Sequence, residues 1–187
     1  MNIFHLDNDP IKAAQMMCDK HVCKMIVEYA QLLSTAHRVL DGEEYYDKTA
    51  NGRKIKRWKH PTLDNQLYKA SHVNHPSNIW VRESDENYFW LYRHFRSACK
   101  EYTHRYGKFH LTDTRLSDTL LNIPKNIPKV GLTKFAQAMP DYCKNFKDPV
   151  EGYRKYYINE KVGFAKWTKR DVPSWFLTGV IAREMVV

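Results

Sequence analysis

The sequence has no apolar run that approaches the ~18 residues of a membrane span. Its first residues also lack the charged region, apolar region and cleavage site of a secretory signal. Four cysteines are present and none belongs to a CxxC pair, so no paired-cysteine zinc motif exists. These absences predict a soluble protein of a reducing cytoplasm, without a membrane partner, whose cysteines are small buried side chains.

Several catalytic motifs are missing as well. The chain contains no GxxxxGK[ST] phosphate loop, no GxGxxG, HExxH or GxSxG, and no HxE with PCxxC. ATP hydrolysis at a Walker-type site, zinc deamination and serine hydrolysis are therefore not expected. His21 lies between Cys18 and Cys23, but no spacing supplies further ligands, so we expect neither a metal nor a cofactor.

Positive charge and aromatic side chains are what the sequence has in excess. Lys and Arg number 30 against 21 Asp and Glu, which gives a net charge of +9 and a pI near 9.3. Aromatic residues make up 13% of the chain. Because such a surplus of positive charge favours phosphate-bearing partners, we expect DNA or a nucleotide as the ligand.

Apolar residues recur mostly at helical spacing, which predicts a mainly α fold. We expect a single compact helical domain over residues 1–187, with a short N-terminal strand at residues 2–6 and long loops. The first helix is predicted from Pro10 to Leu40, with a break near residues 18–20 and a stop at Gly42. Further predicted segments are helices over 63–73, 85–106, 132–139 and from Pro149 onward, and an exposed basic loop over 52–60.

The first predicted helix carries an unusual polar file. At 100° per residue, its members fall within ~80° of arc while the remaining circumference is almost entirely apolar. A surface helix normally shows the reverse, an apolar stripe of roughly 100° and a wide polar back. Since buried charges cost several kcal/mol unless they are compensated, the file is predicted to line a cleft for a phosphate or another anion. The alternative is a solvent-facing file on a helix packed between others. The file consists of Lys20, Lys24, Glu28, Gln31 and Arg38.

The residue types in this file suggest roles in catalysis. Glu28 is the one carboxylate, and we expect it to act as a general base or to stabilise a developing cation. His21 borders the file and could shuttle a proton. Lys20, Lys24 and Arg38 would hold phosphate, and either lysine could instead form a Schiff base.

Other cationic and aromatic residues could line the same cleft. Alternatively, they could pack in the core or stabilise helix ends. Cations near helix entrances and aromatic rings beside them suit phosphate contacts and base stacking. The candidate ligand-binding residues outside the first helix are His75, Trp80, Arg82, Arg105, Trp167 and Arg170.

Several stretches of the chain carry a family resemblance. They are the opening MNIFHLDNDPIKAAQMMCDKHVCKMIVEYAQLLSTAHRVLDG, then HPSNIWVRESDENYFWLY with EYTHRYGK, and finally AMPDYCK, YRKYYINEK and FAKWTKRDVPSWF. In these, the chain resembles small proteins of unassigned function encoded by tailed bacteriophages, including phages of cyanobacteria. More distantly, it is similar to helical DNA glycosylases and to the helical transferases of phage thymine hypermodification. The resemblance implies a protein of the host cytoplasm, active in DNA metabolism, base modification or the countering of nucleotide-based host defence.

Two functional hypotheses from different classes follow. The first is an enzyme that acts on a nucleobase or nucleotide, most directly in DNA base modification or excision. The second is a non-catalytic protein that binds nucleic acid or sequesters a nucleotide signal of host defence. The aromatic and basic composition would also suit a phage structural or interaction protein.

Overall fold

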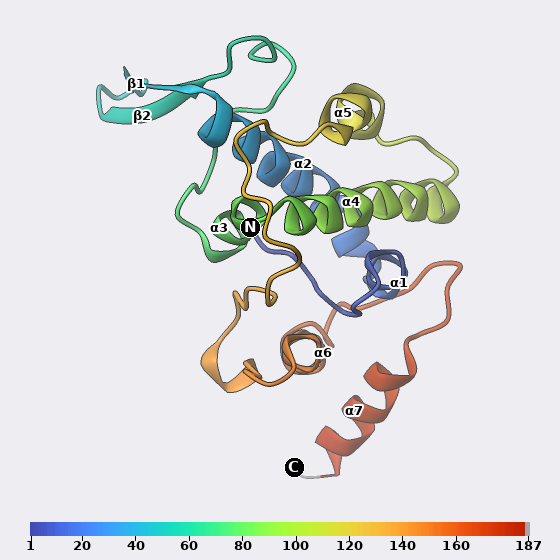
Figure 1. The fold of residues 1–187 in the computed structure, drawn as a ribbon. Helices are drawn as coiled ribbons and strands as arrows, with labels where there is room; N and C mark the ends of the chain where they lie inside the picture. The colour runs from blue at the N-terminus through green and yellow to red at the C-terminus, as the bar shows by residue number, and fades with distance from the viewer. Residues whose placement is uncertain (186–187) are drawn as a thin grey trace.

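The computed structural model describes residues 1–185 and is mainly helical, which confirms the predicted fold class (Figure 1). None of the helices described is both long and apolar enough to cross a membrane. In chain order, the elements are α1 (Pro10–Met16), α2 (Asp19–Asp41), β1 (Glu43–Lys48), β2 (Lys54–Lys59), α3 (Pro76–Glu83), α4 (Asp85–Tyr106), α5 (Leu111–Leu121), the 3₁₀ turn η1 (Asp141–Cys143), α6 (Pro149–Glu160) and α7 (Ser174–Glu184).

The break predicted near residues 18–20 is confirmed, because separate helices lie on either side of it. The side chain of Asp9 caps α1 by accepting the backbone N–H of Ile11 at 2.9 Å. The chain leaves helical geometry after Met16 and re-enters it at Asp19, whose N–H donates to the carbonyl of Lys166 at 2.8 Å. The start of α2 is therefore tied to a segment close to the C-terminal end of the chain.

Helices α2 and α4 cross at the centre of the molecule and supply more core residues than any other two elements described (Figure 1). The aromatic stripe of α4 faces this core, with Tyr88, Phe95 and Cys99 at most 1% exposed. The helix spans the predicted residues 85–106, with Ser84 as its cap and with Gly107 ending it in the left-handed conformation, at φ 66°.

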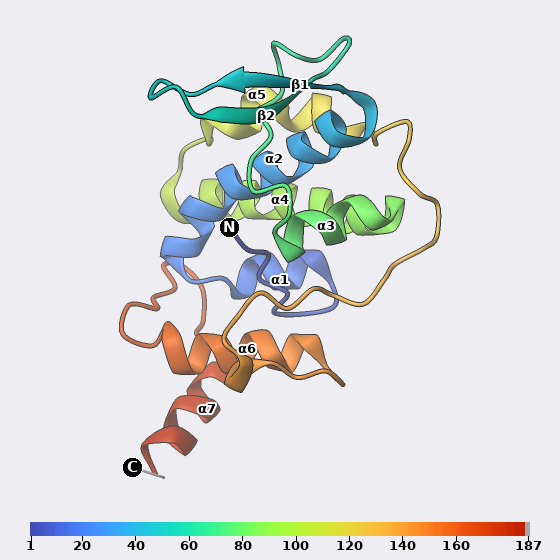
Figure 2. The same cartoon turned by 90° about the vertical axis from the view of Figure 1, so that its left-hand side faces the viewer.

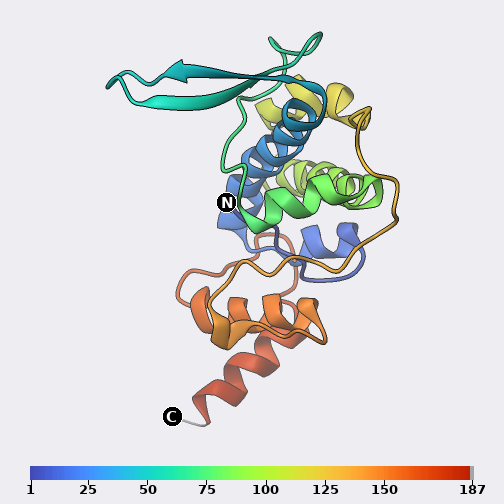
Figure 3. The same cartoon turned by 60° about the vertical axis from the view of Figure 1, so that its left-hand side comes forward.

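Residues 43–59 form an antiparallel hairpin that projects from the helices, where the sequence predicted an exposed basic loop (Figures 2 and 3). Gly42 ends α2, as predicted, and links it to this hairpin at φ −96°, so it is not a left-handed cap. Glycine is required there for another reason. A Cβ at this position would lie 2.4 Å from the carbonyl oxygen of Arg38 and 2.9 Å from that of Lys59.

Three segments differ from the predicted secondary structure. Residues 2–6 are extended and mostly buried but pair with no strand. Residues 63–73 are turns rather than a helix, since the carbonyls of Leu67 and Tyr68 accept hydrogen bonds from Arg38. Residues 132–139 belong to a non-helical strap that runs from α5 to α6 along one side of the molecule (Figures 1 and 3).

Candidate functional site around Glu28

Glu28 lies near the middle of α2 with its side chain 13% exposed. Its carboxylate accepts the backbone N–H of Asn2 at 3.1 Å. The same carboxylate lies 3.1 Å from Nζ of Lys24 and 3.7 Å from the amino group of Met1. The lysine is 67% exposed whereas the Met1 side chain is 3% exposed. A carboxylate between two amines can accept a proton from either.

The first two residues are held against α2 by the strap and by α6. Asn2 Nδ2 donates to the carbonyl of Ala138 at 2.8 Å, and the hydroxyl of Tyr153 on α6 can donate to Asn2 Oδ1 at 3.0 Å. Tyr153 is fully buried. In Figures 1 and 2, the amino-terminal mark lies beside α2 and α3, in the middle of the molecule.

His75 caps α3 and lies within electrostatic reach of this carboxylate. Its Nδ1 accepts the backbone N–H of Ser77 at 3.2 Å, so the neutral ring carries its proton on Nε2 and can donate there. Burial lowers the pKa of His75, and the positive charges of the Met1 amino group and of His72 lower it further, while Glu28 opposes them. The ring is therefore neutral at physiological pH.

Arg82 reaches the same region through Asn78. Its Nη1 donates to Asn78 Oδ1 at 3.3 Å, and Asn78 Nδ2 lies 4.0 Å from Sδ of Met1. Burial lowers the pKa of Arg82, with the charge of Glu83 acting in the opposite direction.

The structure thus links Met1, Lys24, Glu28, His75 and Arg82, and we call this group the amino-terminal site. Four of its members, Lys24, Glu28, His75 and Arg82, are among the candidate residues predicted from the sequence. The site contains one carboxylate, two amines, one imidazole and one guanidinium.

His21 lies two helical turns before Glu28 on α2. Its Nδ1 is hydrogen bonded to the hydroxyl of Tyr157, and its ring stacks on Phe4 at 4.1 Å between centroids. Burial lowers the pKa of His21 to about 3, so the ring is neutral at physiological pH. The side chain belongs to the buried aromatic cluster rather than to the amino-terminal site.

Lys20 and Gln31 lie on α2 outside the contacts of Glu28. Nζ of Lys20 sits 4.6 Å from the ring centroid of Phe164, and the lysine is exposed. Gln31 is half-buried, one turn beyond Glu28. Both could reach a ligand that approaches along the open side of α2.

The guanidinium of Arg38 is fully engaged by the protein. It donates to the carbonyls of Tyr68 at 2.7 Å, Trp58 at 2.9 Å and Leu67 at 3.0 Å, and it pairs with the carboxylate of Asp64. The residue is 5% exposed. Arg38 therefore holds the segment after the hairpin, and we do not place it in the amino-terminal site.

Arg105 and Arg170 share the carboxylate of Glu101. Arg105 donates to Glu101 at 3.2 Å and to Asp19 at 3.0 Å, while Arg170 donates to Glu101 Oε1 at 2.5 Å. The hydrogen bond that Arg170 donates to the carboxylate of Glu101 raises the pKa of Arg170. These ion pairs join α4, the start of α2 and the segment before α7, so neither arginine reaches the amino-terminal site in this arrangement.

The two tryptophans that were candidates for base stacking are buried. Trp80 packs edge-on against Trp90 and Phe135, with centroids 6.1 and 5.6 Å apart. Trp167 donates its Nε1–H to the carbonyl of Met16 at 2.9 Å. At 2% and 9% exposure, neither ring offers a free face to a base.

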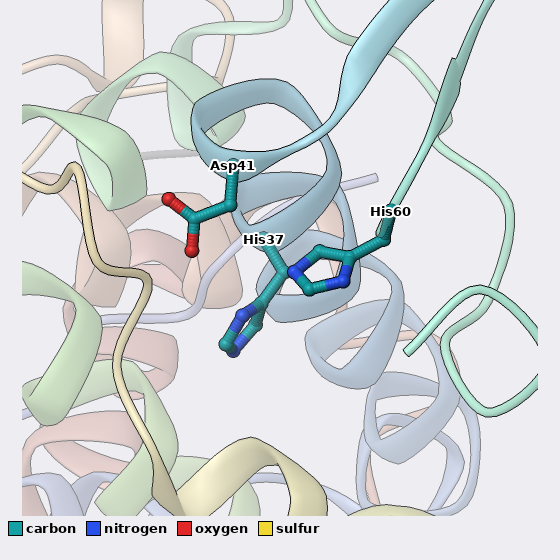
Figure 4. A group of neighbouring side chains, drawn as sticks. All are labelled: His37, Asp41 and His60. Atoms are coloured by element: carbon teal, nitrogen blue, oxygen red, sulfur yellow. The ribbon is translucent and has the colours of Figure 1, made fainter. Parts of the chain in front are cut away.

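One group of side chains in residues 1–185 has the composition of a metal site: His37, Asp41 and His60 (Figure 4). It lies at the end of α2, at the base of the hairpin. The group is separate from the amino-terminal site.

Sequence reasoning missed the contribution of Met1 and Asn2 to the site. An α-amino group and a backbone N–H leave no side-chain pattern, and Glu28 is 26 residues from Asn2 along the chain. The only available signal was that the apolar segment 2–6 directly precedes the capped start of α1.

Fold and site together define a basic, mainly helical protein with a largely buried carboxylate that lies beside two amines. A family model described as pyrimidine dimer DNA glycosylase matches residues 1–114, which include every residue of the amino-terminal site. The chain belongs to this family. No curated protein and no solved structure matches the chain.

Proposed function

We propose that this protein is a DNA glycosylase that removes a base at a pyrimidine dimer, and that the amino-terminal site performs the reaction. The observation that carries the proposal is the carboxylate of Glu28 beside the amino group of Met1. The family description names this activity, and the net charge of +9 suits a DNA substrate.

The reaction begins with attack by a neutral primary amine on C1′ of the damaged nucleotide. An N–C1′ bond forms as the bond from C1′ to the base breaks, and the electron pair leaves with the base, which takes up a proton. The attacking amine loses its proton to Glu28. The nitrogen lone pair then forms a C1′=N double bond as the C1′–O4′ bond breaks, and O4′ keeps that electron pair and takes up a proton. Water hydrolyses the resulting Schiff base, which releases the amine and leaves C1′ as an aldehyde.

Two amines contact the carboxylate, and we assign the attack to the amino group of Met1 rather than to Lys24. The amino group of Met1 belongs to the segment that Asn2 fixes against α2, whereas the side chain of Lys24 is 67% exposed and extends into solvent. The exposed lysine is better placed to contact a phosphate beside the damaged nucleotide. His75 and Arg82 border the same site and can contribute donors to the DNA backbone.

Replacing Glu28 by Gln tests the role of the carboxylate. We expect excision from a duplex with a single cyclobutane dimer to fall by roughly 10²–10⁴-fold, because the proton acceptor is lost. Affinity for the same duplex should change by less than about threefold. Glu151→Gln, an exposed acid on α6, is the matched control and should retain activity. If Glu28→Gln retained full excision activity, Glu28 would have no role in the reaction.

Reduction with borohydride identifies the attacking amine. The reagent traps a Schiff base as a stable protein–DNA adduct, and mass spectrometry of the adduct peptides locates the linkage. We expect the linkage on the peptide that carries Met1. A linkage on Lys24 would show that Lys24, and not the amino group of Met1, is the nucleophile. Tight binding of dimer DNA without excision would support the alternative of a non-catalytic DNA-binding protein.

A further inference from the structure

We infer that the hairpin of residues 43–59 binds in the major groove of the DNA duplex that the amino-terminal site engages. The inference rests on the proposed function, which supplies DNA as the partner. The major groove of B-DNA is ~12 Å wide and admits an antiparallel two-stranded ribbon. Strands β1 and β2 form such a ribbon, and six residues in each strand, at ~3.3 Å per residue, give it a length of about 20 Å.

The hairpin is free to enter a groove because it is not packed into the protein. None of residues 43–59 belongs to the hydrophobic core, and every residue of β1 is exposed. In the part of the chain that the structure describes, the two strands pair only with each other, so each has a free edge. A two-stranded hairpin without further packing is only marginally stable. A binding partner therefore accounts for the projecting hairpin better than the stability of the fold does.

The charge of the hairpin is complementary to DNA. Residues 43–59 contain six Lys and Arg against three Asp and Glu. Two of the acids are paired within the hairpin, Glu44 with Lys56 at 2.9 Å and Asp47 with Arg57 at 3.7 Å. The positive surplus thus remains available for phosphate groups. Within residues 1–185, the hairpin cations that form no ion pair are Lys48, Arg53, Lys54 and Lys59.

The two faces of the ribbon differ in charge. Side chains alternate between the faces of a strand, and cross-strand partners share one face. One face, which we call the lysine face, carries three lysines and a single acid, whereas the other face carries as many acids as cations. The lysine face consists of Glu44, Tyr46, Lys48, Lys54, Lys56 and Trp58, and the other face of Glu43, Tyr45, Asp47, Ile55, Arg57 and Lys59.

The face without a charge surplus is turned toward the protein. Its members Tyr45, Asp47 and Arg57 line a cavity of about 260 Å³ together with residues of the turns after the hairpin. Trp58 borders the cavity as well, but no lysine of the lysine face does. The lysine face is therefore the one that a duplex can reach.

Tyr46 adds an aromatic ring to the lysine face. Its side chain is 58% exposed, and Nζ of Lys54 lies 3.8 Å from the centroid of the ring. A cation held over an aromatic face is restrained by that contact. Ring and charge can therefore reach a base edge and a neighbouring phosphate together.

Helix α2 sets the distance between the hairpin and the amino-terminal site. Glu28 and Gly42 are fourteen residues apart on and at the end of this helix, which corresponds to about 21 Å. An amine that attacks C1′ approaches from the minor groove, because the C1′ atoms of a duplex border that groove. On the same face of B-DNA, the neighbouring major groove lies half a helical turn away, at about 17 Å. In Figure 3, the hairpin projects on the side where the amino terminus lies, so one duplex can contact both.

A duplex with a filled major groove tests the inference. Glucose attached to 5-hydroxymethylcytosine occupies the major groove and leaves the minor groove open. Fluorescence anisotropy gives the affinity of the full chain for plain and glucosylated duplexes of one sequence, each with and without a central dimer. We expect glucose to weaken binding by the unmodified chain at least about fivefold, because it blocks the groove that the ribbon enters.

A double variant shows whether the hairpin causes this sensitivity. Lys48→Ala with Lys54→Ala should bind the plain duplex more weakly and should bind plain and glucosylated duplexes within about twofold of each other, because its contacts in the groove are already lost. Lys147→Ala with Lys155→Ala removes the same charge from exposed positions in and before α6 and should keep the full sensitivity to glucose. Equal binding of both duplexes by the unmodified chain, or undiminished sensitivity of the hairpin variant, would overturn the inference.

Two neighbouring tyrosines test which face meets the DNA. Tyr46→Ser should weaken binding to the plain duplex by about twofold to tenfold, since the ring and the lysine that it restrains are both affected. Tyr45→Ser, on the other face, is the matched control and should bind as the unmodified chain does, with the folding of both variants checked by thermal unfolding. Weaker binding by Tyr45→Ser alone would overturn the assignment of the lysine face. These measurements need no excision, so a chain without glycosylase activity that shows hairpin-dependent sensitivity to glucose would refute the proposed function and support the inference.

Discussion

The hydroxyl of Tyr153 lies 3.0 Å from Oδ1 of Asn2, although 151 residues separate them along the chain. Asn2 in turn donates its backbone N–H to Glu28. Helix α6 lies outside the residues 1–114 that match the family model, yet it positions the segment that carries the amino group of the proposed site.

Tyr153→Phe should therefore affect catalysis more than binding. The ring still fills its buried position, but the hydrogen bond that positions Asn2 is lost, at a cost of about 1 kcal/mol in the free energy of unfolding. We expect kcat for excision to fall about tenfold with KM nearly unchanged, because a misplaced nucleophile slows the reaction without removing DNA contacts. Steady-state kinetics on dimer DNA measure both values. Tyr142→Phe, at an exposed tyrosine, is the control, and equal kcat in the two variants would contradict the positioning role.

The hairpin should contribute to DNA affinity through its basic tip. Double replacement of Arg53 and Lys54 by Ala should reduce the slope of log K against log salt by roughly two, since each lost phosphate contact removes about one released counterion. Fluorescence anisotropy with a duplex at several salt concentrations gives this slope. Lys155→Ala on α6, at the opposite end of the molecule from the hairpin (Figure 2), should leave it unchanged. Identical slopes in all three proteins would exclude the hairpin from the DNA interface.

Gly42→Ala should destabilise the fold by about 1–3 kcal/mol, as other overpacked substitutions do. The new Cβ would lie 2.4 Å from the carbonyl oxygen of Arg38 and 2.9 Å from that of Lys59. Gly163→Ala has no atom within 4 Å of the added Cβ and serves as the matched control. Urea unfolding of both variants measures the difference, and similar midpoints would show that the backbone at Gly42 can relax.

Acid should destabilise the protein through His94. The ring is fully buried, Pro10 accepts from Nδ1 at 2.9 Å, and burial lowers the pKa of His94 to about 4 against the opposing effect of that hydrogen bond. An unfolded chain takes up the same proton near pH 6.5. The contribution of this neutral ring is therefore complete above pH 6.5 and is lost as the pH falls toward 4, by up to about 3 kcal/mol. Urea unfolding across this range, with chelator present, should show a smaller loss for His94→Gln, and an equal loss would assign the acid sensitivity to other groups.

The helices whose ends are marked by capping residues nearby in the sequence could be predicted. Asp9 before Pro10, and Ser84 and Gly107 around α4, mark boundaries that the structure confirms. Residues 63–73 could not be predicted, because the guanidinium of Arg38, at least 26 residues earlier in the chain, takes the carbonyls of Asp64, Leu67 and Tyr68. The hairpin at residues 43–59 was also missed, since its strands are charged and exposed and carry no alternating apolar pattern.

The polar file on α2 also has a part that the sequence predicts and a part that only the structure shows. Periodicity grouped Lys24, Glu28 and Arg38 on one side of a helix, which requires only the geometry of 3.6 residues per turn. The structure separates them, because Glu28 contacts the amino-terminal segment while Arg38 is enclosed by the turns after the hairpin.

By itself, the sequence determined the helical class, the break before α2, the positive charge and the carboxylate on the narrow polar face. These properties depend on composition and on residues within one or two helical turns of each other. Only the tertiary structure decided that the amino group of Met1 lies beside Glu28 and that His60 lies beside His37. Both contacts join residues more than twenty positions apart, so they depend on how the helices pack, and no local pattern specifies them.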